Sequence, residues 1–241
     1  AYYMNQTAQR HLDAYRCLEG LAAANSRSPL VYSELSALTV EARTNGFAYP
    51  AAPTDELAMN LARRSVQLGP ASPFAHRAMG FLYSRKGDTV ESVRWMGKAY
   101  QFNIYDLSMA ASYGYALVFA GNYQDGATVL QHAVEASSAH PTWWDYSLFV
   151  AAFMNDHFAV AMRASEALTT KGRPHYLAAR IIAAHCAGKT DLAATLRDQF
   201  VAEYPELAAD PKRIFRDRHR SPEVLDKLVG ALAAAGVGAS G

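Results

Sequence analysis

A repeat of about 34 residues constrains this sequence more than any other feature. Gly87 and Gly121 mark two successive units of the repeat, and a polar residue follows each of them. Each glycine separates two stretches of about 13 residues in which apolar residues recur every three or four positions. That spacing is typical of amphipathic helices, and a glycine between two helices lets the chain reverse direction. The sequence therefore predicts one antiparallel pair of helices per repeat.

The same interval continues beyond these two units. Counting one further interval from Gly121 leads to Asn155-Asp156, where asparagine can adopt the left-handed geometry that glycine takes elsewhere. A fourth unit follows after nearly the same interval at Gly188 and closes at Pro205. Small residues recur where paired helices must approach closely, and large residues fill the gaps beside them. We therefore expect four units over residues 73–205.

The repeat resembles the tetratricopeptide repeat (TPR), a two-helix unit of the same length. The residues that carry the resemblance are Met79-Gly80, Tyr83, Gly87, Ala99, Tyr113-Gly114, Gly121-Asn122-Tyr123, Ala133, Trp144 and Pro205. Three positions depart from the pattern, since Ser92 and Gly126 replace the alanine of the second helix and Ile181 replaces a small residue. The resemblance implies an all-α fold, a right-handed superhelical solenoid of antiparallel helix pairs.

Additional helices are expected before the four units. Residues 1–28 predict one long or two shorter N-terminal helices. Residues 29–70 predict a helix pair with an inserted loop at 44–54, because two prolines and a glycine interrupt the apolar pattern there. We expect the whole chain, 1–241, to form a single TPR-like domain.

A helix is also expected after the four units. Ser221 and Pro222 are typical of a helix start and Gly236 of a helix stop, so residues 222–236 predict a C-terminal capping helix. The basic segment Lys212–Arg220 before it is interpreted as a solvated linker, with docking to phosphate groups or to an acidic partner as the alternatives.

The order of segments resembles one bacterial lineage more closely. It runs from DELAMNLARRSVQLGP through AHRAMGFLYSRKGD, FNIYDLSMAASYGYALVFAGNY and PTWWDYSL to EVLDKLVGALAAAGV, and it covers nearly the whole chain. This order is similar to the C-terminal TPR region of class III adenylate cyclases and of membrane-linked winged-helix transcriptional regulators. In those proteins a catalytic or DNA-binding domain lies N-terminal to the repeats. The resemblance implies a regulatory module, and a first residue other than Met is expected of a processed product or of a piece of a longer chain.

Composition gives no sign of nucleic-acid or membrane binding. The formal net charge of +1 provides no overall attraction to nucleic acid or to an anionic bilayer. No apolar run is long enough to span a bilayer, so we expect a soluble domain. The two cysteines lack the CxxC spacing of zinc or redox sites, and their number is compatible with both cytoplasm and periplasm.

Motifs for catalysis are missing as well. AHCAGKT, residues 184–190, ends like a phosphate-binding loop but lacks the first glycine and the preceding strand, so it predicts a turn between helices. The eight histidines show no HxxxH or HExxH spacing, although His175, His185 and Cys186 on one predicted helix leave a metal site open. We expect a non-enzymatic protein with no catalytic residue, no cofactor and no metal.

The TPR resemblance also implies where a partner would bind. In TPR proteins the first helix of each pair lines a concave surface. The corresponding positions here are rich in aromatic, basic and histidine side chains: Phe74, Arg77, Phe81, Arg85, Tyr115, Phe119, Phe149, Phe153, His175 and His185. We expect this groove to bind a protein or peptide. Two alternatives stay open: the chain's own terminal helices fill the groove, or a small apolar or anionic ligand enters it near Arg77 and Arg85.

Overall fold

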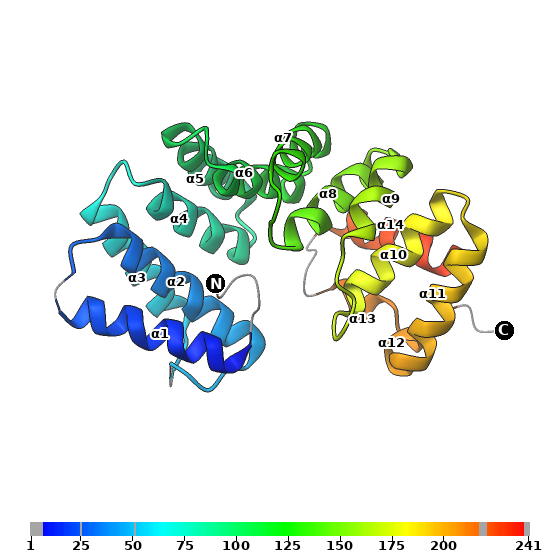
Figure 1. Cartoon of the computed structure of the whole chain (residues 1–241), viewed down its shortest axis with the longest axis horizontal. Coiled ribbons are helices and arrows are strands. Elements are labelled where there is room, and N and C mark those ends of the chain that lie inside the picture. Colours follow the sequence, from blue (N-terminus) through cyan, green and yellow to red (C-terminus); the bar gives the residue numbers. More distant parts are fainter. Residues whose placement is uncertain (1–6, 25, 51, 217–220, 239–241) are drawn as a thin grey trace. The chain divides into compact units, whose positions relative to one another are not determined.

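The computed structural model describes residues 7–24, 26–50, 52–216 and 221–238, and these fold into helices α1 to α14 (Figure 1). The helices are α1 (Ala8–Ala23), α2 (Pro29–Asn45), α3 (Asp55–Leu68), α4 (Pro73–Lys86), α5 (Thr89–Phe102), α6 (Leu107–Phe119), α7 (Tyr123–Ala136), α8 (Trp143–Met154), α9 (Phe158–Glu166), α10 (Pro174–Cys186), α11 (Thr190–Glu203), α12 (Pro205–Ala209), α13 (Lys212–Phe215) and α14 (Pro222–Ala234). Consecutive helices pack in pairs, which confirms the predicted all-α fold. The chain divides into two compact units, Ala1–Ala116 and Leu117–Gly241, and the boundary falls within α6.

The first unit stacks helix pairs on one another. α2 pairs with α3 and α4 pairs with α5, while α2 also packs against α1 and α4 (Figure 1). Gly80 marks the close approach of α4 to α5, because a Cβ atom there would lie 2.4 Å from Cγ of Met96. The predicted small residue at this position therefore has a direct steric cause.

The N-terminal region contains one helix before the first helix pair. A single helix, α1, spans the described part of the predicted N-terminal segment, and residues 1–6 of that prediction lie outside the described residues. The predicted loop at 44–54 begins two residues later than expected, because α2 continues to Asn45 and ends at Gly46 with φ +64°.

The second unit combines helix pairs with an added C-terminal segment. α8 packs against α7 and α9, and α10 packs against α9 and α11. From α11 the chain continues through α12 to α13 and α14, and both α13 and α14 pack back against α10. α10 is therefore covered by more elements than the pairing of repeats requires.

Left-handed turn residues fix where each second helix begins. Gly87, Gly121 and Gly188 have φ of +83°, +88° and +72°, as the sequence predicts for the turns between paired helices. In the third pair the prediction is wrong by one residue: Asn155 has φ −90°, and Asp156 takes the left-handed conformation with φ +57°. Aspartate tolerates this conformation better than most residues, which allows the turn to form one position later than the repeat interval predicts.

The C-terminal segment differs from the predicted solvated linker. Lys212 to Phe215 form helix α13, whose Lys212 and Arg213 are exposed while Ile214 and Phe215 are buried. The interpretation as a solvated linker is therefore wrong for Ile214 and Phe215, whose apolar side chains hold the segment against the unit. The last four residues of the basic segment, 217–220, lie outside the described residues.

Candidate binding surfaces

Aromatic and basic side chains lie along α4 in the first unit. Phe74, Phe81 and Arg85 are each partly exposed, and so is Arg77. Nη2 of Arg77 donates to Oε1 of Glu34 on α2 at 2.7 Å, and its guanidinium carbon lies 5.5 Å from the centre of the Phe74 ring. The side chains of Arg77 and Glu34 are 26% and 16% exposed, so this ion pair lies at the surface between two helices. α2 and α4 together form a surface of mixed aromatic and charged character.

α6 extends this surface. Oγ of Ser84 donates to Oη of Tyr115 at 3.3 Å, which links α4 to α6. Tyr113 stacks on Tyr100 of α5 with ring centroids 5.8 Å apart. A Cβ atom at Gly97 would lie 3.3 Å from the Tyr113 ring, so the missing side chain leaves room for that ring. The surface that we call the Arg77 surface consists of Glu34, Phe74, Arg77, Phe81, Ser84, Arg85 and Tyr115.

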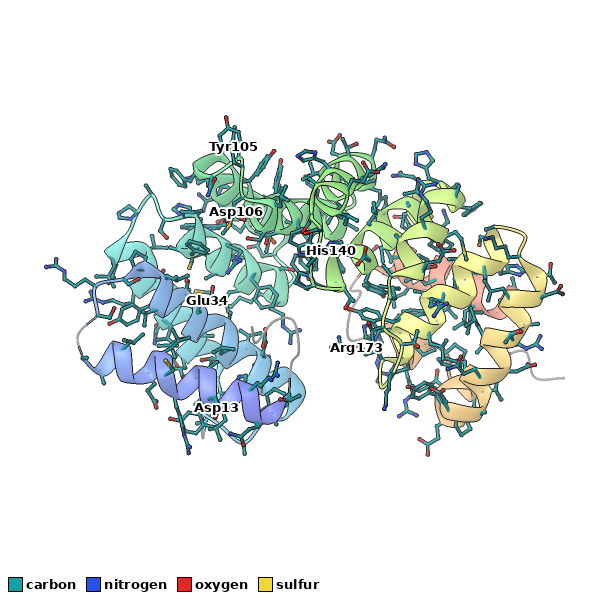
Figure 2. The ribbon with its side chains drawn as sticks, viewed as in Figure 1. Asp13, Glu34, Tyr105, Asp106, His140 and Arg173 are labelled. Atoms are coloured by element: carbon teal, nitrogen blue, oxygen red, sulfur yellow. The ribbon has the colours of Figure 1, made fainter. Side chains whose placement is uncertain are left out.

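A second exposed feature of the first unit lies outside this surface. The last residue of α5, Phe102, and two residues of the connection to α6, Ile104 and Tyr105, are 49%, 53% and 89% exposed. Figure 2 shows Tyr105 projecting away from the helices of the unit. The sequence prediction did not include these residues. The signal that could have identified them is a group of large apolar side chains at the end of a predicted helix and just after it.

In the second unit, most of the predicted groove residues are not exposed. Phe149, Phe153 and His175 are 0%, 2% and 4% exposed, respectively. His185 is exposed and Phe119 is partly exposed. The structure therefore leaves α4 and its neighbours accessible, whereas the corresponding side chains of α8 and the start of α10 are buried.

The one-residue offset of the third turn explains the position of Phe149. Phe149 precedes the left-handed Asp156 by seven residues, just as Gly80 precedes the left-handed Gly87. Gly80 is the point at which α4 meets α5, at Met96. Counted from the turn that the structure contains, Phe149 occupies the helix-pairing position, and its complete burial agrees with that position.

The chain's own C-terminal helices cover α10. Leu228 and Leu232 of α14 and Phe215 of α13 have no exposed surface, and Val224 of α14 is also buried. Since both helices pack against α10, their apolar side chains are buried on the second unit. The sequence left open whether the chain's own terminal helices or a bound ligand fills the predicted groove. On α10 the structure shows the C-terminal helices α13 and α14.

Lys227 connects α14 to the carboxyl end of α8. Its Nζ donates to the carbonyl oxygen of Met154 at 3.1 Å and to Oδ1 of Asp156 at 2.7 Å. The same atom lies 5.2 Å from the centre of the Phe153 ring. A helix carboxyl end, a carboxylate and an aromatic face all attract a cation, so these three groups form an ammonium-binding site. The left-handed turn at Asp156, one residue later than predicted, provides the carboxylate.

A histidine–aspartate pair anchors the connection between α7 and α8. Nε2 of His140 lies 3.0 and 3.2 Å from the two carboxylate oxygens of Asp145, and the His140 ring stacks on Trp144 at 5.2 Å. Burial raises the pKa of Asp145, an effect that the hydrogen bond from His140 opposes. Figure 2 marks His140 at this connection. The contacts hold the loop against the first turn of α8, which is a structural role.

The residues considered for metal or phosphate chemistry are not arranged for it. His175 and His185 are ten residues apart on α10, which corresponds to about 15 Å along a helix, too far to share one ion. Nowhere in the described residues do three or more His, Cys, Asp or Glu side chains gather in a way that could hold a metal ion. Lys189 stands at the start of α11 after Gly188, as expected of a turn between helices. Burial raises the pKa of the Cys186 thiol, which disfavours a reactive thiolate.

Comparison with known proteins identifies the fold. No protein-family model and no curated protein matches the chain. Among solved structures, YrrB, described as a TPR protein with an unusual peptide-binding site, matches with a TM-score of 0.53 at 15% identity, over 78% of this chain and 92% of YrrB. PilF of Pseudomonas aeruginosa matches with a TM-score of 0.59 at 15% identity, over 83% and 86% of the two chains. The Cut9–Hcn1 tetramer of the APC/C matches at 0.65 and 10% identity, over 98% of this chain and 45% of the other. These similarities show the TPR solenoid fold.

Within the described ranges, no helix has both the length and the apolar character needed to cross a bilayer.

Proposed function

We propose that this chain is a non-catalytic scaffold that binds a protein or peptide partner on the Arg77 surface. The exposure of this surface carries the proposal: its aromatic and basic side chains are partly open to solvent, whereas Phe149, Phe153 and His175 of the second unit are buried. Aromatic and arginine side chains contribute most of the binding energy at many protein interfaces. The structural similarity to YrrB, a TPR protein with a peptide-binding site, supports the same class of function.

The chemistry of the surface suits a peptide with apolar and acidic side chains. Phe74, Phe81 and Tyr115 offer partly exposed rings against which apolar side chains can pack. Arg77 is held by Glu34 in the free protein, and a carboxylate of the partner can take the place of Glu34 because a guanidinium binds carboxylates in a planar, directional way. Exchange of one carboxylate for another keeps the Arg77 guanidinium paired in the complex.

The biological setting proposed for this scaffold is regulatory. The order of segments that resembles the repeat region of bacterial adenylate cyclases and winged-helix regulators supports a module within a larger signalling or transcription-regulating protein. In the same proposal the chain forms one TPR-like domain over 1–241, with four units at 73–205. The repeat in the sequence supports this division.

Matched aromatic deletions test the proposed surface. The partners retained by the immobilised wild-type chain are identified, and their binding is compared between Phe81→Ala and Tyr105→Ala. Both changes remove a partly or fully exposed ring from the first unit, but only Phe81 belongs to the Arg77 surface. We expect Phe81→Ala to weaken binding at least tenfold, the usual effect of losing an aromatic anchor of about 1.4 kcal/mol or more. Unchanged binding by Phe81→Ala together with loss in Tyr105→Ala would place the interface on the α5–α6 connection instead.

A ligand screen separates the scaffold from the small-molecule alternative. A compound that raises the melting temperature of the wild type but not of an Arg77→Met variant would favour a sensor, since a ligand that binds only the folded state stabilises it. Under the proposed function, we expect stabilisation by peptides and none by small apolar or anionic compounds.

A further inference from the structure

α14 lies on the second unit as a helical ligand would. Its buried face consists of the adjacent Val224 and Leu225, then Leu228 three residues on and Leu232 four residues further, as in an amphipathic helix that packs on an apolar surface. Opposite this face, Glu223 and Asp226 are exposed. α14 is also the last helix of the described chain and packs on α10 alongside α13. Its contacts therefore resemble those of a separate amphipathic helix.

The single basic residue on the side that meets the unit has a specific receptor. Nζ of Lys227 contacts the Met154 carbonyl, the Asp156 carboxylate and the Phe153 ring. All three groups belong to the end of α8 and the turn after it, so the receptor is built without any contribution from α14. Replacing Lys227 with an uncharged or acidic residue would leave a helix carboxyl end and a carboxylate without their cation.

Two features make α14 less stable as a helix than its sequence could be. Gly230 lies in the interior of the helix, and a Cβ atom there would meet nothing within 4 Å. Close packing therefore does not require a glycine at position 230, although glycine makes a helix less stable than alanine does. The Ser221 side chain makes no capping hydrogen bond to the first turn of α14 and hydrogen-bonds instead with the Tyr123 side chain of α7. The glycine and the missing cap lower the intrinsic helix stability of α14 without changing the face of α10 on which it packs.

We propose that the face of α10 under α14, together with the Lys227 receptor at the end of α8, is a second binding surface, which takes a lysine-bearing amphipathic helix from a partner protein in exchange for α14. This goes beyond the function proposed above, because it concerns the second unit and does not depend on the Arg77 surface. The partner helix needs apolar residues in the spacing of α14, because displacing α14 exposes an apolar face that must be covered again. It also needs a lysine in register with Lys227, because the receptor at the end of α8 remains in place.

The test uses the full chain and a fluorescent peptide with the sequence of residues 221–238 as the probe. Binding is measured by anisotropy to the wild type, to Gly230→Ala and to Lys227→Glu. Gly230→Ala strengthens the helix of α14, so we expect about fivefold weaker peptide binding than to the wild type. Lys227→Glu sets a carboxylate against Asp156 and loosens α14, so we expect tighter binding. Lys171→Glu, on the exposed turn before α10, is the matched charge control and leaves the affinity unchanged.

Peptide variants test the lysine receptor itself. A peptide carrying the Lys227→Glu change should bind at least tenfold more weakly than the parent peptide to the same Lys227→Glu chain, whereas one carrying Asp226→Asn should bind equally well, because Asp226 is exposed. Equal affinity of all three chains for the peptide, or no loss with the glutamate peptide, would overturn the proposal. A wild-type dimer that disappears in Lys227→Glu would assign the groove to α14 of a second copy and would also overturn it.

Hydrogen exchange keeps the proposal testable if Lys227→Glu does not fold. In the wild type, the amides of α14 should exchange faster than those of α10, through openings that release α14 alone. Gly230→Ala should slow the exchange of α14 about fivefold and leave α10 unchanged. Exchange of α14 and α10 at one common rate would show that α14 leaves only when the unit unfolds, and would refute its role as a displaceable occupant.

Discussion

Replacing Gly80 with alanine tests the packing of paired helices most sharply. The new Cβ atom would lie 2.4 Å from Cγ of Met96, 3.0 Å from the Met96 backbone nitrogen and 3.2 Å from the Ser92 carbonyl oxygen. The Met96 side chain is 2% exposed and has little room to move, and the two backbone atoms belong to α5. Relief of the contacts therefore requires α4 and α5 to move apart.

The magnitude follows from two opposing effects. Alanine gains about 1 kcal/mol over glycine in the interior of a helix. Overpacking of a close contact costs about 1–3 kcal/mol, and the backbone contacts place Gly80 toward the upper part of that range. We expect a net loss of about 1–2 kcal/mol in the free energy of unfolding. For a chain of this length, each kcal/mol corresponds to about 2–4 °C in Tm.

Gly20→Ala is the matched control, because Gly20 lies inside α1 of the same unit and a Cβ atom there meets nothing within 4 Å. This variant should be stabilised by about 1 kcal/mol from helix propensity alone. Urea denaturation followed by circular dichroism in the far ultraviolet measures both variants under identical conditions. Equal stabilisation of Gly80→Ala and Gly20→Ala would show that α4 and α5 do not approach closely enough at Gly80 to exclude a Cβ atom.

Three further predictions concern other parts of the chain. Burial between Trp95 and Phe102 lowers the pKa of His76, so the unfolded state binds the proton more readily than the folded state. The wild type should therefore lose stability relative to His76→Phe as the pH falls below about 6.5. Urea titrations at pH 7.5 and 5.5 measure this, and an equal difference in the free energy of unfolding between the two proteins at both pH values would contradict the prediction. Leu228→Ala removes a side chain with no exposed surface and should lower the free energy of unfolding of the second unit by about 2–5 kcal/mol, as measured by chemical denaturation. A loss below about 1 kcal/mol would argue against burial of α14. Gly121→Ala should lose about 1–2 kcal/mol from the left-handed φ of +88° alone, since no atom lies near its Cβ position, and an unchanged Tm would contradict that conformation.

The periodic part of the sequence was sufficient to predict most of the fold. The left-handed turns need glycines such as Gly87 and Gly121, and the close approach of α4 to α5 needs a small residue at Gly80. The residue type alone therefore identifies these positions in the sequence. The offset at Asp156 was not predictable from spacing, because Asn155 and Asp156 are both able to adopt the left-handed conformation. The register of α8, and with it the position of Phe149, depends on that single choice.

The binding surfaces were harder to predict than the fold. A capping helix at 222–236 follows from Ser221, Pro222 and Gly236, but these residues mark only where the helix begins and ends. Where α14 packs depends on contacts between residues far apart in the sequence, such as Lys227 with Met154 and Asp156. The same holds for Ile214 and Phe215, whose burial against the second unit has no local signal other than their apolar character.

Site-specific cross-linking tests the central claim, that the Arg77 surface binds the partner. A photoreactive phenylalanine analogue is placed at position 81 or, as the control, at position 105, and irradiated in cells that express the full protein. We expect one dominant adduct from position 81, with the partner's cross-linked peptide identified by mass spectrometry, and none from position 105. Adducts from position 105 alone, or an intact and folded protein that yields none from position 81, would show that the Arg77 surface does not bind the partner.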